Sequence, residues 1–132
     1  MTQAHSTEQT FILQAMVSMA AADGDALERK AATISALYSQ VTGDAVSVDE
    51  ISAAPGSYRA RGLTFAGELA RENNRLTRKT KEAILSGAYM VLLANGQVSA
   101  RERKKLIDFV KALRISEIHR SVIFEDVERT YH

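Results

Sequence analysis

The sequence predicts an all-α protein, and three observations lead to this fold class. Apolar residues recur at spacings of three and four over several long segments, which is the pattern of amphipathic helices. Ser followed three residues later by Glu or Gln, the form of a capping box, precedes several of these segments. No segment of useful length alternates with a period of two, so no strand is expected. We therefore expect a compact bundle of about seven helices.

The first three expected helices lie in the N-terminal half. One spans about residues 7–22, after a capping box formed by Ser6 and Gln9, and it stops where Gly24 can take the left-handed conformation that ends helices. A second begins after Asp25 as its N-cap and closes at Gly43. Their apolar stripes consist of Phe11, Ile12, Ala15, Met16, Met19 and Ala20, and of Leu27, Ala31, Ile34, Leu37, Tyr38 and Val41. A short third helix opens at a capping box of Ser47 and Glu50 and ends before Pro55.

The remaining helices follow a less regular connector. Residues 57–74 predict a connecting helix with a frayed start, because each of its two Gly residues costs about 1 kcal/mol relative to Ala. From Thr77 a strongly apolar helix runs to Gly96, which predicts a central position. Ser99 with Glu102 opens the sixth helix and Ser116 caps the seventh. The inward residues expected there are Leu106, Ile107, Val110 and Leu113, and then Ile118, Val122 and Val127.

The order of helix, Asp-Gly or Asn-Gly loop and helix occurs twice, about 72 residues apart. We interpret this as an internal pseudo-two-fold repeat of helical hairpins within one domain, 1–132. The halves cover about 6–54 and 77–131, with 57–74 as connector.

Composition limits the class of protein further. The chain of 132 residues has no Cys, which excludes a disulfide framework and Cys-based metal sites. The start lacks the pattern of a secretory signal, and the longest apolar segment, Ala83 to Ala94, is shorter than the roughly 20 residues of a spanning helix. We expect a cytoplasmic protein without a transmembrane segment.

Two phrases carry a family resemblance: "AMVSMAAADGDALERKAATISAL" and "AILSGAYMVLLANGQVSARERKKLIDFVKAL". They resemble the TerB-like family of bacterial tellurite-resistance and stress-response proteins, in which an apolar helix ends in "ADG" and a Glu starts the next helix. The resemblance covers most of the chain outside residues 57–74. It implies an all-helical pseudo-symmetric module without catalytic activity, acting with protein partners at the inner membrane.

The resemblance also implies a divalent-metal site, formed by acidic residues of the two loops. The matching positions are Asp23, Asp25, Glu28, Asn95 and Glu102. Asn95 stands where the family usually has Asp, and a neutral ligand predicts that Ca²⁺, Mg²⁺ or Mn²⁺ binds weakly. The same residues also have a purely structural interpretation, since Asp25 can be an N-cap and Glu28 and Glu102 favour the positive ends of helices. Both interpretations stay open.

No sequence feature indicates an enzyme. The chain has no phosphate-binding loop and no nucleophile motif. Its three histidines, His5, His119 and His132, lie near a terminus or alone on a helix, without the paired spacing of a zinc helix. We expect no catalytic residue and no cofactor other than a weakly held divalent cation.

The charge distribution allows an alternative function without metal. Residues 59–114 carry 13 basic and 5 acidic side chains. If the basic runs 75–81 and 101–105 begin adjacent helices, they form a basic face that would recognise a protein or nucleic-acid partner. The runs lack the interleaved aromatic residues that stack on bases, so nucleic acid is the less favoured partner.

Overall fold

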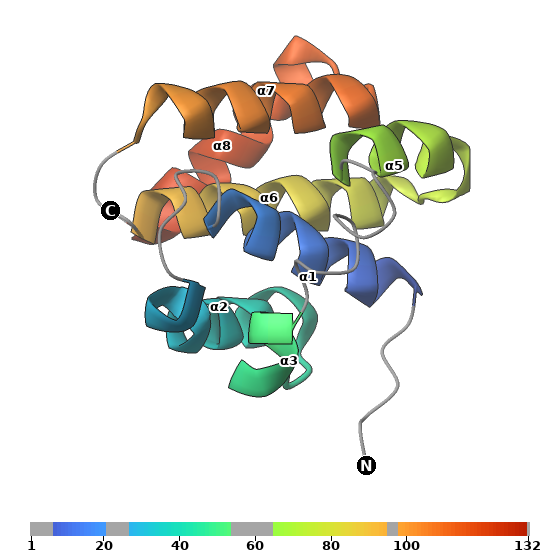
Figure 1. The fold of residues 1–132 in the computed structure, drawn as a ribbon. Coiled ribbons are helices and arrows are strands. Elements are labelled where there is room, and N and C mark those ends of the chain that lie inside the picture. The colour runs from blue at the N-terminus through green and yellow to red at the C-terminus, as the bar shows by residue number, and fades with distance from the viewer. Residues whose placement is uncertain (1–6, 21–26, 54–64, 95–97, 132) are drawn as a thin grey trace.

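A computed structural model describes residues 7–20, 27–53, 65–94 and 98–131, and it confirms the all-α class. Over these residues the chain forms seven α-helices, one short 3-10 turn and no strand (Figure 1). The elements are α1 (Thr7–Ala20), α2 (Leu27–Thr42), α3 (Val48–Ala53), α5 (Phe65–Glu72), η1 (Asn73–Arg75), α6 (Arg78–Ala94), α7 (Ala100–Leu113) and α8 (Glu117–Tyr131).

Helices α1 and α6 form the centre of the bundle and run in the same direction (Figure 1). The start of α1, at Glu8, and the start of α6, at Thr80, line the same pocket. Further along, a Cβ built at Gly87 of α6 would lie only 3.1 Å from Cγ of Met16 in α1. Gly87 therefore permits the two helices to approach closely. The predicted central position of α6 is confirmed, since α6 contacts α1, α2, α7 and α8.

The other helices cover opposite sides of this central pair. Helices α2 and α3 lie on one side, and α5 and α7 lie on the other, as Figure 1 shows. The rings of Phe11, Phe65 and Phe109 join α1, α5 and α7, with centroid separations of 6.2 Å and 5.4 Å. These distances fall in the range of favourable aromatic pairs. The expected connector is thus part of the core, because Phe65 and Leu69 of α5 are buried in it.

Helix ends follow the local signals of the sequence. Gly43 ends α2 with a positive φ of 79°, and Ser47 accepts a hydrogen bond from the Glu50 amide at 3.1 Å. The Ser99 capping box is complete, and Ser116 accepts from the His119 amide at 3.2 Å. These predicted caps are confirmed. Those expected at Ser6, Gly24, Asp25 and Gly96, and the stop at Pro55, lie outside the described residues.

Of the residues predicted to face inward on α8, Val127 is confirmed, whereas Ile118 and Val122 are wrong. Ile118 is 81% exposed and Val122 54% exposed, while Ile123 and Val127 are buried. The reason is that polar residues also contact α6: His119 Nε2 lies 2.6 Å from a Glu82 oxygen. Hydrogen bonds between helices therefore help to set the rotation of α8, and apolar spacing alone misplaces it.

Two further expectations about the bundle differ from the structure or remain predictions. Ile107, expected in the core, is 45% exposed on α7. The order of helices agrees with a repeat, but the third helices of the two halves pack differently: α3 packs on α2, whereas α8 packs on α6. The pseudo-two-fold symmetry therefore stays a prediction.

Candidate functional site

One end of the molecule collects the helix termini that flank the two Gly-containing loops. Because α1 and α6 are parallel, their C-terminal ends lie at the same end of the bundle, and α2 and α7 begin there (Figure 1). We call these four helix ends the elbow end: the last turns of α1 and α6 and the first two turns of α2 and α7. It is the region in which the sequence places the metal candidates.

Two lysines bind the last turn of α1 at the elbow end. Lys30 of α2 donates from Nζ to the Ala20 carbonyl at 2.9 Å, and Lys105 of α7 donates to the Ser18 carbonyl at 3.3 Å. The last four carbonyls of a helix have no partner within the helix and carry its negative dipole end. The two ammonium groups satisfy such carbonyls and tie the second helix of each predicted hairpin to α1.

Glu102 is the predicted metal ligand that the structure describes most fully. Its side chain is 2% exposed, and Oε1 accepts a hydrogen bond from the Ser99 amide at 3.0 Å. Its own amide donates to Ser99 Oγ at 3.1 Å. The carboxylate thus begins α7 as half of a capping box. This position agrees with the structural interpretation of Glu102.

The remaining metal candidates lie wholly or partly outside the described residues. This applies to Asp23, Asp25 and Asn95, and to the side chain of Glu28, whose backbone belongs to the first turn of α2. Within the described part of the chain, no group of three or more His, Asp or Glu side chains is placed to hold a metal ion. The five-residue metal site therefore stays a prediction.

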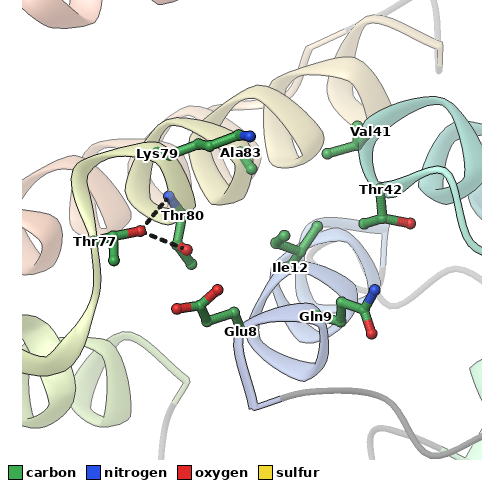
Figure 2. Close-up of a pocket in the computed structure, with 9 residues that line it drawn as sticks. All are labelled: Glu8, Gln9, Ile12, Val41, Thr42, Thr77, Lys79, Thr80 and Ala83. Carbon is green, nitrogen blue, oxygen red and sulfur yellow. Dashed lines mark hydrogen bonds between the residues drawn. The ribbon is translucent and has the colours of Figure 1, made fainter.

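A polar pocket of about 330 Å³ lies at the other end of the central pair, where α1 and α6 begin and α2 ends (Figure 2). Thr77 accepts a hydrogen bond from the Thr80 amide at 3.1 Å, and the two hydroxyls lie 2.9 Å apart. Ile12 and Ala83 contribute apolar wall, while Glu8, Gln9, Val41, Thr42 and Lys79 complete the lining. With one acidic and one basic side chain, this lining carries no net charge that would select a ligand.

A second pocket of about 310 Å³, which we call the basic pocket, lies where α6 begins, α7 ends and α8 begins. Its lining consists of Arg78, Lys81, Leu113, Arg114, Ile115, Ser116 and His119. Sequence reasoning missed it, because its cations come from segments that are about 30 residues apart. The sequence around a basic residue at the end of one helix does not show that a basic residue of another helix will lie beside it.

The basic pocket also corrects the expected basic face. A helix of 17 residues such as α6 is about 25 Å long. Since α7 begins beyond the far end of α6, the runs 75–81 and 101–105 lie at opposite ends of it (Figure 1). The prediction that the two basic runs lie on adjacent helix starts is therefore wrong. The first run instead lies beside Arg114, at the end of α7.

A tyrosine with a perturbed pKa lies between α6 and α8. Burial, followed by the hydrogen bond to Glu128, raises the pKa of Tyr89 to about 12. The Tyr89 hydroxyl donates to Glu128 at 2.6 Å, and the ring lies 4.5 Å from that of Phe124. The high pKa keeps the phenol protonated, so Tyr89 acts as a hydrogen-bond donor that holds α8 in place.

Comparison with known proteins gives no relative from which a function follows. No protein-family model matches the chain, and neither a curated protein nor a solved structure does. Among the described helices, none has the length and apolar character needed to cross a membrane.

Proposed function

We propose that the chain is a non-catalytic TerB-like module that acts in bacterial stress physiology through protein partners and holds a divalent cation weakly at its elbow end. The two phrases of the sequence that resemble this family fall on α1 with α2 and on α6 with α7. The observation that carries the proposal is the pair of lysine contacts to α1. They hold the first two turns of α2 and α7 against the last turn of α1, as a site shared by both loops requires.

Helix electrostatics supports a cation at the elbow end. Each helix C-terminus carries about half a negative elementary charge, and parallel packing brings two such termini together. Asp23 and Asp25 lie in the segment of sequence between α1 and α2 and add carboxylates. Lys30 and Lys105 already supply two resident positive charges to α1, which opposes a further cation. Weak binding follows from this balance and from the neutral Asn95.

Calorimetric titration with Ca²⁺, Mg²⁺ and Mn²⁺ tests this proposal. We expect a dissociation constant no tighter than tens of micromolar, about −6 kcal/mol. Asp23→Asn should abolish binding, while Asp49→Asn, which removes the same charge from α3, should leave it unchanged. Submicromolar affinity that survives Asp23→Asn would show that the ligands are assigned wrongly.

A metal-free adaptor is the second candidate function. It is favoured by the exposed Ile118 and Val122, one turn apart on α8, which leave apolar surface for a partner. The two basic runs do not form one face, because they lie at opposite ends of α6, and this weakens the nucleic-acid version. A thermal midpoint unchanged by all three divalent ions favours this candidate over the first, and a DNA shift assay at low and moderate salt separates protein from nucleic-acid partners.

A further inference from the structure

The basic pocket gathers cationic side chains from three helix ends. Arg78 and Lys81 come from the first turn of α6, Arg114 follows α7, and His119 belongs to the first turn of α8. Glu82 lies beside them and interacts with Arg78 at 3.8 Å and with His119 at 2.6 Å. Among the described residues, no acidic side chain lies within ion-pair distance of Lys81 or of Arg114. Their charges therefore remain available to a ligand.

We propose that the basic pocket binds a phosphate monoester, with the phosphoryl group among Lys81, Arg114 and Arg78 and the organic part against the half-buried Ile115. A phosphoryl group carries nearly two negative charges at neutral pH and three acceptor oxygens, which match several separate cationic donors. This site is distinct from the elbow end and needs no divalent cation. The proposal thus extends beyond the function proposed above.

The backbone around the pocket also favours an anion. Ser116 bonds the His119 amide, and the amides of Glu117 and Ile118 have no carbonyl partner within α8, as at every helix start. They add the positive end of a 15-residue helix to the side-chain cations. Glu117 is exposed beside them and offsets part of this charge, so the side-chain cations supply the larger share.

Arg114 occupies a position that usually holds Gly. It ends α7 in the left-handed conformation, with φ 55°, and its amide donates to the Lys111 carbonyl at 3.2 Å. It is the one non-Gly residue with positive φ among those described. An Arg at this site adds a cationic side chain to the residues that line the pocket, which Gly would not do.

The lining favours a small organic phosphate over a polynucleotide. The lining contains no Phe, Tyr or Trp, and its one aromatic ring, that of His119, is 19% exposed and contacts Glu82, so bases would find little stacking surface. The volume of about 310 Å³ is at the lower end of the range for small-molecule pockets. The second basic run lies at the other end of α6, so a strand would have to extend along α7 to contact both runs.

Titration of the full chain followed by amide NMR shifts tests the proposal, with glycerol phosphate and inorganic phosphate as probes at constant ionic strength. We expect saturable shifts at the amides of Ser116, Glu117 and Ile118. Lys81→Gln should weaken binding about fivefold, and Lys81→Gln combined with Arg114→Gln by more than about tenfold. Tighter binding of glycerol phosphate indicates an organic ligand, and equal affinity indicates free phosphate.

Lys79→Gln is the matched control. Lys79 lies two residues before Lys81 and carries the same charge, but it lines the polar pocket and not the basic pocket. It should change the affinity less than about twofold, because an exposed charge outside the pocket is screened by salt. Equal losses in Lys79→Gln and Lys81→Gln would overturn the proposal, as would no saturable shift at millimolar phosphate. A single-stranded oligonucleotide that binds more tightly than either probe, with shifts at both basic runs, would replace it with a nucleic-acid surface.

Discussion

Replacement of Glu102 separates its capping role from a metal-binding role. Glu102→Ala removes the acceptor of the Ser99 amide and leaves that donor without its partner near a buried helix start. The unsatisfied Ser99 amide costs about 1–2 kcal/mol, and loss of the buried side-chain methylene of Glu102 adds about 0.8 kcal/mol. We therefore expect the free energy of unfolding to fall by about 2–3 kcal/mol. Glu102→Gln keeps an accepting oxygen and should cost less than about 1 kcal/mol.

Thermal unfolding followed by far-UV circular dichroism measures this difference. For 132 residues the unfolding entropy is about 0.28 kcal/mol/K, so Glu102→Ala should lower Tm by about 9 °C and Glu102→Gln by less than about 4 °C. A Gln variant as unstable as the Ala variant would refute the reasoning, because the charge and not the accepting oxygen would then be essential. Repeating the scan with Mn²⁺ adds the metal test: only a ligand role predicts that the Gln variant loses stabilisation by the ion.

Three further predictions concern single contacts. Lys105→Met should lower stability by about 0.5–1 kcal/mol in urea unfolding, because the last turn of α1 loses an ammonium donor; no loss would mean that water replaces it fully. The pKa of Tyr89 rises from 10.0 to about 12 on folding, so its contribution to stability is complete below pH 10 and is lost between pH 10 and 12. In unfolding scans at alkaline pH, Tyr89→Phe should remove this part of the pH dependence. Ile118→Ser should change the free energy of unfolding by less than about 0.5 kcal/mol, whereas Ile123→Ala should lower it by about 2–4 kcal/mol. The reverse order would show that Ile118, and not Ile123, faces the core.

Local signals in the sequence predicted the helix ends well. The Ser99 capping box and the left-handed Gly43 depend on atoms within one turn of the chain, so a short stretch of sequence contains the whole cause. The buried stripe of α1 was equally readable, because Met16 and Met19 lie among apolar neighbours at helical spacing.

Features that depend on distant residues were not readable. The rotation of α8 follows from contacts of His119 with Glu82 and of Tyr89 with Glu128, and a polar side chain gives no sign in advance that it will face another helix. The two pockets have the same origin, since each forms where three helix ends meet. The metal candidates depend on the two loops, so their assignment remains a prediction.

The phenylalanine contacts have a consequence for how the chain can be divided. Phe65 of the expected connector lies between a ring from the first half and a ring from the second, and both halves share one core. In a fragment that begins at residue 77, Phe109 would lose its contact with Phe65, and the face of α6 that packs on α1 would be exposed to water. Such a fragment should self-associate or remain unfolded. The two predicted halves therefore depend on each other for folding, whatever their origin.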